Sequence, residues 1–173
     1  KGLSQLRRKS GATSTVGLGQ ELGVGDKITT DKDSLIDILL SDGTLVKIGT
    51  NSEYKFLGAQ PKSGFLYHAF ELLRGSVRAM VEKHPDKKNI KCRINTPAGT
   101  MGVRGTEIVL NHQKAEEKTS LYLLEGVAIF GSQSCEKEKI CIEVKAGEWA
   151  TISKGQKKPS PVEKFEAEDL FGG

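Results

Sequence analysis

The stretch TPAGTMGVRGTE, residues 96–107, combines residue types that can bind a small charged ligand. Gly99, Gly102 and Gly105 recur at every third position, and Arg104 lies among small and apolar neighbours. Backbone N–H groups beside glycines, together with an arginine, can bind an anion or the carboxylate of a peptide. The same glycines, and the proline before them, are also typical of a tight corner that brings two stretches of backbone close together.

A corner is the favoured interpretation, because a buried ion pair also explains an isolated arginine. Glu107 or Glu125 would then pair with Arg104. This interpretation predicts that Gly102→Val or Gly105→Val impairs folding and that Arg104→Ala has a milder effect. For contact with a partner, the candidate residues are Arg104, Glu107 and Arg78, the last in the segment FELLRGSVRAMV.

The sequence shows no set of residues that is typical of an enzyme active site. The histidines lie apart at His68, His84 and His112, and no serine stands in a G-x-S-x-G elbow. The glycines of GLGQELGVG, residues 17–25, are spaced G-x-G-x-x-x-G, which differs from a dinucleotide-binding loop. We therefore nominate no catalytic residue, and we expect no cofactor and no metal site.

The three cysteines allow two interpretations, one with a disulfide and one without. Cys135 and Cys141 flank the polar segment EKEKI, a spacing that lets them face each other across a short hairpin. They would form a disulfide in an oxidising compartment, or they would remain two unpaired thiols. Cys92 stands between charged residues in KCRIN, and no C-x-x-C motif is present, which argues against zinc.

Composition indicates one soluble domain. The chain has 173 residues, of which 36% are hydrophobic and 28% are charged. No apolar run approaches the roughly eighteen residues that span a bilayer, so we expect no membrane insertion of this chain. The net charge is +4, but 26 basic residues are scattered among 22 acidic ones, which argues against nucleic acid as a partner.

Short alternating segments rich in Val, Ile, Leu and Thr predict an all-β fold, an antiparallel, jelly-roll-like β-sandwich. The clearest hairpin covers residues 35–49. A three-residue loop with Gly43 in the left-handed region segregates a core face from a face with opposite charges. That register pairs Ile36 with Ile48, Ile38 with Val46, Leu40 with Thr44, Asp37 with Lys47 and Leu39 with Leu45.

The chain changes character near its end. Residues 1–153 carry the strand pattern, and residues 154–173 are expected to form a charged tail with two prolines and a short helix around residues 162–171. Phe165, Leu170 and Phe171 are the apolar residues of the tail, and we expect them to dock onto the domain.

The order of several segments resembles the FecR domain, the periplasmic domain of the ferric-citrate regulator family. The similarity covers roughly residues 15–155 and depends on DGT, on LL-x-G-x-V and above all on TP-x-GT-x-GVRGTE. It implies an antiparallel β domain outside the cytoplasm that acts through protein contacts. In the regulator, this domain receives a signal from an outer-membrane transporter and passes it to a sigma factor. The chain shows neither the anti-sigma helical region nor the membrane helix of the regulator, so the resemblance implies the fold more than the pathway.

The expected function is therefore that of a non-catalytic, exported or periplasmic domain that binds a protein partner in signal transduction or envelope assembly. The rival hypothesis is a carbohydrate-binding or peptidoglycan-binding β-sandwich, which needs aromatic side chains in a groove. Trp149 is the single tryptophan, and aromatic residues amount to 6% of the chain, which is low for a sugar-binding platform.

Overall fold

The computed structural model describes residues 3–62, 65–81, 90–103 and 105–171. Its elements follow the chain in the order β1 (Gln5–Arg7), β2 (Thr13–Thr15), β3 (Lys27–Thr29), β4 (Ile36–Leu39), β5 (Leu45–Ile48), β6 (Glu53–Lys62), β7 (Phe65–Met80), β8 (Ile90–Asn95), β9 (Thr100–Val103), β10 (Glu107–Gln113), β11 (Lys118–Glu125), β12 (Val127–Gly131), α1 (Cys135–Glu138), β13 (Ile142–Lys145), β14 (Glu148–Ser153), β15 (Glu163–Lys164) and α2 (Ala167–Phe171). The predicted all-β fold is confirmed.

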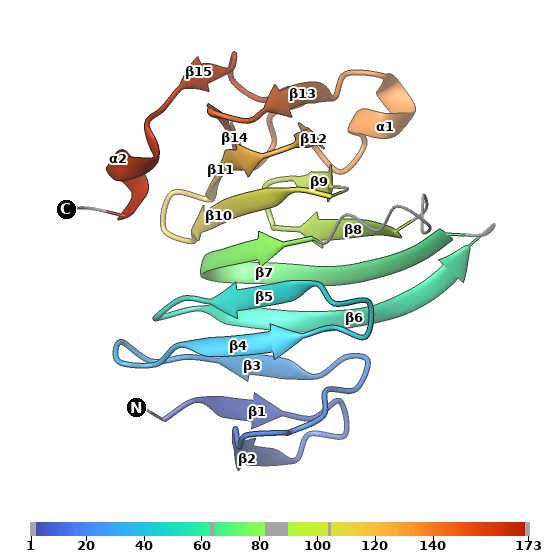
Figure 1. The fold of residues 1–173 in the computed structure, drawn as a ribbon, viewed down its shortest axis with the longest axis vertical. Helices are drawn as coiled ribbons and strands as arrows, with labels where there is room; N and C mark the ends of the chain where they lie inside the picture. Colours follow the sequence, from blue (N-terminus) through green and yellow to red (C-terminus); the bar gives the residue numbers. More distant parts are fainter. Residues whose placement is uncertain (1–2, 63–64, 82–89, 104, 172–173) are drawn as a thin grey trace.

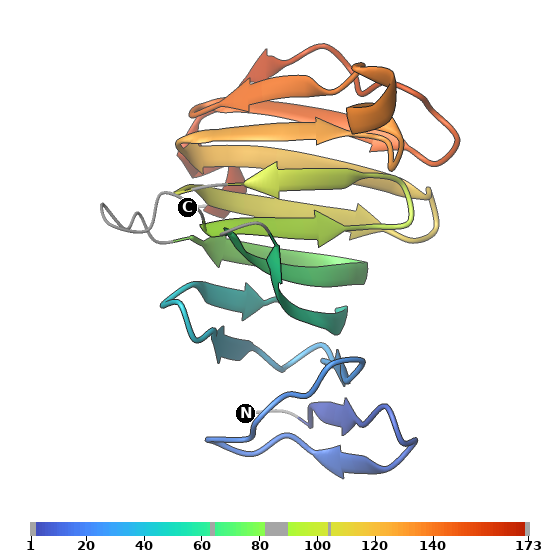
Figure 2. The ribbon, with the colours of Figure 1, turned by 90° about the vertical axis from the view of Figure 1, so that its right-hand side faces the viewer.

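The long strand β7 joins two layers of sheet. Its first half pairs with β6 and β8, and its second half pairs with β5 and β10. Gly75, with a φ of 85°, lies where the strand passes from one set of partners to the other. Layer A has the order β2-β1-β3-β6-β7-β8-β9-β12-β13, and layer B has the order β4-β5-β7-β10-β11-β14-β15. Figures 1 and 2 show the strands stacked along the long axis, with β1 and β2 at one end.

The strand pairs are antiparallel, as predicted, except for β7 and β8, which run parallel. Parallel neighbours cannot be joined by a tight turn, so β7 and β8 do not form a hairpin although they follow one another in the chain. The fold is therefore a sandwich whose two layers belong to one continuous sheet.

One hydrophobic core fills the space between the layers. Tyr54 and Phe70 of layer A and Leu110 and Leu121 of layer B are fully excluded from solvent. In β10 and β11 buried and more exposed residues alternate, which is the two-residue period expected of strands with one face on a core.

The predicted hairpin of β4 and β5 is confirmed in register. Ile36 pairs with Ile48, Ile38 with Val46, Asp37 with Lys47 and Leu39 with Leu45. The Leu40 N–H donates to the Thr44 carbonyl at 2.9 Å, and Gly43 has a φ of 91°. A glycine at this position adopts the left-handed conformation without the steric cost that a side chain adds.

The three glycines of residues 96–107 have different structural roles. A Cβ on Gly99 would lie 2.6 Å from the Gly131 carbonyl oxygen, so this glycine allows two backbones to approach closely. Gly105 has a φ of 54° and lies in the left-handed region. The expectation for Gly102 is wrong. It occupies a regular position in β9, and an added Cβ would meet no atom within 4 Å.

Candidate functional site

The structure brings two of the three candidate partner-binding residues together on the outer face of layer B. Arg78 of β7 donates from Nε to Oε1 of Glu107 of β10 at 2.6 Å, and a second guanidinium nitrogen contacts the same oxygen. Arg78 and Glu107 keep 39% and 24% of their side-chain surface exposed. Glu107 therefore pairs with Arg78. Arg104, the residue for which the sequence suggested Glu107 as partner, lies outside the described residues.

This ion pair belongs to a row of side chains across layer B. The strand registers place Asp37, Lys47 and Arg78 side by side on β4, β5 and β7. Lys47 donates to Asp37 at 2.7 Å, and both side chains are about half exposed. The row leaves the carboxylate of Asp37 on the open edge of the layer.

Cys135 and Cys141 are joined by a disulfide that closes the short turn around α1. The bond links Cys135, the first residue of α1, to Cys141, which directly precedes β13. Cys92 is a buried thiol in β8, and burial, together with the nearby charge of Asp42, raises its pKa far above the ordinary value. A buried thiol of this kind is protonated and unreactive.

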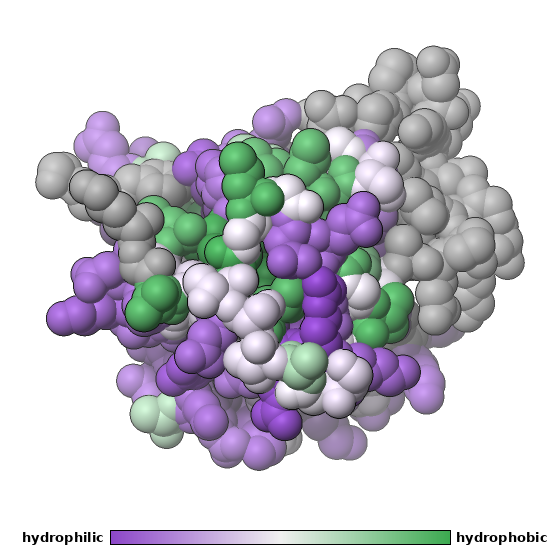
Figure 3. Space-filling view, turned by 90° about the horizontal axis from the view of Figure 1, so that it is seen from below, coloured by the Kyte–Doolittle hydropathy of each residue, from purple (hydrophilic) through white to green (hydrophobic). Residues whose placement is uncertain are grey.

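An open groove lies at the end of the sandwich where the chain starts. It has a volume of about 1170 Å³ and runs between residues 16–22 on one side and residues 34–41 on the other. Its apolar lining includes Val16, Leu22, Ile36 and Phe56, which pack against the core and yet remain partly exposed. Figure 3 looks onto this end of the molecule and shows apolar surface in a hollow between polar rims.

The β4 edge borders this groove. In the described residues β4 pairs with β5 and has no neighbour on its other side. Leu35 and Leu39 beside it are exposed by 74% and 73%, and Leu18 on the facing loop is fully exposed. Exposed leucines grouped around a hollow are characteristic of interaction sites.

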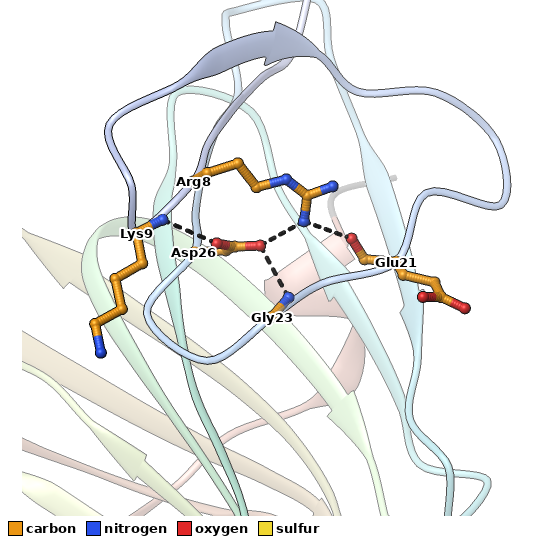
Figure 4. A network of polar contacts seen from close by, with 5 residues as sticks. All are labelled: Arg8, Lys9, Glu21, Gly23 and Asp26. Carbon is orange, nitrogen blue, oxygen red and sulfur yellow. Dashed lines mark hydrogen bonds and ion pairs between the residues drawn. The ribbon is translucent and has the colours of Figure 1, made fainter.

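A buried aspartate holds in place the loop of residues 16–22, which forms the wall of the groove opposite β4. Asp26 accepts hydrogen bonds from the Arg8 guanidinium at 2.6 Å, the Gly23 N–H at 2.8 Å and the Lys9 N–H at 3.0 Å. Arg8 also donates to the Glu21 carbonyl at 2.9 Å, as Figure 4 shows. Burial raises the pKa of Asp26, but these hydrogen bonds outweigh burial and hold the pKa below its ordinary value. The network ties the loop to the residues that follow β1.

A second buried pair lies beneath the groove. Nε2 of His68, on β7, is 3.1 Å from Oδ2 of Asp42 in the β4–β5 turn, and both side chains are almost completely buried. His68 also lines the groove. Neither of its ring nitrogens has a hydrogen-bond partner of good geometry among the described residues, so the contact of Nε2 with Asp42 is a close polar approach. The pair holds the β4–β5 turn against layer A.

Aromatic residues form a separate cluster on the outer face of layer B. The rings of Tyr122 and Trp149 stack with their centres 5.3 Å apart, and the ring of Phe165 meets Tyr122 edge-on at 5.4 Å. Phe165 belongs to the tail, which also adds β15 to the edge of β14. The tail is thus docked on the domain through Phe165.

The part of the chain that the structure describes also bears on metal binding and on membrane insertion. Within those residues, no three His, Cys, Asp or Glu side chains are grouped so as to hold a metal ion. None of the described helices has the length and apolar character needed to cross a bilayer.

Sequence reasoning missed the groove, the Asp26 network and the Asp42–His68 pair. One signal for the groove was present. The predicted register places Leu39 and Leu45 opposite each other on the face of the hairpin that also carries Asp37 and Lys47. Leucines on a solvent-facing surface next to an unpaired edge indicate a contact surface. Asp26 and His68 gave no such signal, because the charged side chains that they contact, Arg8 and Asp42, are distant in the sequence.

The chain belongs to the FecR protein family, whose model matches residues 26–129. The matched segment begins at the buried Asp26 and ends within β12. No curated protein matches the sequence.

Two solved structures share the fold. Both are crystal structures of a "putative anti-sigma factor" from Parabacteroides distasonis ATCC 8503, at 1.65 Å and 2.50 Å resolution. Each is 12% identical to this chain, with a TM-score of 0.66 over 84% of it. The alignment spans 62% of the length of the solved protein. At this identity the likeness shows a common fold.

Proposed function

We propose that this chain is a non-catalytic signalling domain of the bacterial envelope that acts by binding a protein partner. The observation that carries the proposal is the open edge of β4 beside a groove with an apolar lining. Membership of the FecR family supports a role in signal transduction, and the disulfide between Cys135 and Cys141 fits an oxidising compartment.

The outer face of layer B is the second surface available to a partner. Its Arg78–Glu107 pair presents both charges at a fixed place, and part of each side chain remains exposed. Partly exposed ion pairs add little to stability but can steer association and fix the register of a partner. The pair is therefore better suited to recognition than to folding.

The proposal is tested by site-specific photocrosslinking in envelope extracts. A photoreactive residue is placed at Leu39 or at Arg78, and the matched control carries it at Glu143, which is exposed on β13 at the opposite end of the molecule. We expect one or a few proteins to crosslink at the first two positions and not at the third. A preparation that captures no protein at any of these positions, yet turns over a substrate, would contradict the proposal.

A carbohydrate-binding function is the second candidate, and the Tyr122–Trp149 stack is the observation that favours it. Stacked aromatic rings on a sheet can receive the face of a sugar ring. Phe165 of the docked tail already contacts Tyr122, however, so the cluster is used at least in part by the chain itself. Glycan-array binding that is lost in Trp149→Ala would favour this candidate over protein binding.

A further inference from the structure

We propose that the groove receives an extended segment of the partner polypeptide, which adds as a strand to the open edge of β4 and carries a lysine or arginine beside Asp37. The inference rests on the proposed function, because it specifies which kind of protein partner binds and where. It assigns the groove as a strand-addition site, and four independent features of the structure support it.

The first feature is an unequal number of strands in the two layers. Counting from the shared strand β7 toward the start of the chain, layer A continues through β6, β3, β1 and β2, whereas layer B continues through β5 and β4. Figure 1 shows β1 and β2 extending beyond β4. Within the described residues, no strand of layer B covers this end of layer A. The place next to β4 is therefore open for one more strand.

The second feature is the hydrogen-bonding pattern of β4. Leu40 donates to the Thr44 carbonyl, and hydrogen-bonded pairs alternate with non-bonded ones in an antiparallel ladder. Ile38 and Ile36 therefore bond to β5, whereas Asp37 and Leu39 direct their N–H and C=O groups toward the groove side. An exposed row of backbone donors and acceptors is a template for an additional strand.

The third feature is the apolar character of the groove and its size. A strand placed beside β4 directs every second side chain toward Val16, Leu22 and Phe56, which are incompletely covered. The volume of about 1170 Å³ exceeds the range of roughly 300–1,000 Å³ that is usual for pockets of small molecules. The space suits a polypeptide segment with alternating apolar residues.

The fourth feature is charge. Among the described residues that line the groove, Glu21 and Asp37 are acidic, and none is a lysine or an arginine. Asp37 is 55% exposed and is flanked by Lys47 on its β5 side, so its open side faces the position of the added strand. A cation at the outward position opposite Asp37 would form a favourable cross-strand pair. This acidic lining differs from the chain as a whole, which has a net charge of +4.

The wall opposite β4 is fixed before any partner arrives. Asp26 binds the N–H of Gly23 and the guanidinium of Arg8, and Arg8 binds the carbonyl of Glu21, as seen in Figure 4. A wall that is already held in place reduces the entropy lost when a segment enters the groove.

In the experiment, the full chain is the target on which peptides are selected from a display library of short random sequences. The affinity of the selected peptides is then measured by fluorescence anisotropy. We expect selected peptides to alternate apolar residues and to share a lysine or arginine. Leu39→Pro removes an N–H that points away from β5, so it blocks strand addition while sparing the hairpin. We expect it to weaken binding at least about tenfold. Asp37→Lys reverses the charge and is expected to have a similar effect.

Glu143→Lys is the matched control for the charge reversal. Glu143 is exposed, lies on an edge strand and has a lysine partner, Lys145, much as Asp37 has Lys47. This variant should bind the selected peptides as the unchanged protein does. If Leu39→Pro does not fold, as judged by circular dichroism, Asp37→Lys decides the question.

Three results would overturn the proposal. Selected peptides that bind both variants with unchanged affinity would place the binding site elsewhere. The absence of saturable binding up to about 1 mM would show that no peptide segment is received. A dimer in sedimentation experiments that Asp37→Lys dissociates would identify a second copy of this chain as the occupant. In the first two cases, crosslinking at Arg78 would still support a protein partner, so the strand-addition site and the proposed function fail separately.

Discussion

Asp42 and His68 join the two layers of the sandwich from positions 26 residues apart in the sequence. Oδ2 of Asp42 lies 3.1 Å from Nε2 of His68, and the side chains are 1% and 2% exposed. Asp42 also accepts hydrogen bonds from the N–H and the hydroxyl of Thr44 in its own turn. A buried carboxylate without such partners would destabilise the fold. The contacts with His68 and Thr44 therefore allow the β4–β5 turn to be buried with Asp42 in it.

Asp42→Asn should lower the free energy of unfolding by about 1–3 kcal/mol near neutral pH, because a buried network loses its charge. Burial raises the pKa of Asp42, but the close His68 ring and the hydrogen bonds from Thr44 outweigh burial and hold the pKa below its ordinary value. The native state therefore favours the ionised form. The ionised carboxylate of Asp42 therefore stabilises the fold at a pH above its pKa in the unfolded state. This contribution is lost as the pH falls through its pKa in the native state.

Urea unfolding over a descending pH series measures this effect. The stability difference between the unchanged protein and Asp42→Asn should shrink as the solution becomes acidic. Asp33→Asn is the matched control, because Asp33 is exposed, and it should leave stability nearly unchanged. A constant difference at every pH would show that the charge of Asp42 contributes nothing.

Gly75→Ala should destabilise the protein, and Gly102→Ala should not. Gly75 has a φ of 85°, and an added Cβ would lie 2.6 Å from Cα of Ser52. The left-handed backbone alone costs about 1–2 kcal/mol for a residue with a side chain, and the backbone clash adds to it. Gly102 has open space at its Cβ position. Thermal melting compares the two variants, and equal melting temperatures would contradict the role assigned to Gly75.

The three cysteines should become accessible to a thiol reagent under different conditions. In the native protein a thiol reagent should label none of them, because Cys135 and Cys141 are bonded and Cys92 is buried with a raised pKa. Unfolding without a reductant should expose one thiol. Reduction should cost roughly 2 kcal/mol of stability, since the disulfide closes a short loop. Cys92→Ser provides the control, and rapid labelling of native protein at Cys92 would contradict its burial.

Local patterns in the sequence were sufficient for the all-β class and for one hairpin, but not for the helix α1, which stands where a hairpin between Cys135 and Cys141 was expected. The register of β4 and β5 follows from keeping Ile36 and Ile38 on the core face and Asp37 beside Lys47, and the structure has this register. Gly102 was misjudged because its spacing from Gly99 and Gly105 suggested a shared role, whereas it faces outward from a regular strand.

Contacts between distant residues were beyond such reasoning. Arg78 lies 29 residues before Glu107, and only the antiparallel pairing of β7 with β10 brings them together. The groove depends on how many strands each layer has, which is set by the course of β7 through both layers. Neither the Arg78–Glu107 contact nor the groove can be inferred from a few neighbouring residues. The sequence therefore indicated Arg78 and Glu107 as separate candidates and did not show that they form a pair.

The docked tail provides the last prediction, which also separates the two candidate functions. Phe165→Ala removes the ring that meets Tyr122 edge-on, and an aromatic contact of this kind contributes about 0.5–1.5 kcal/mol. Loss of the contact should expose the neighbouring Trp149 and shift its fluorescence emission to longer wavelengths. Val162→Ala, at an exposed position before β15, is the control and should leave the emission unchanged. If the released Tyr122–Trp149 stack gains affinity for glycans, the aromatic cluster is a sugar site covered by the tail. If Phe165→Ala shifts the emission without glycan binding, the cluster serves to hold the tail, and the partner surface is to be sought at β4.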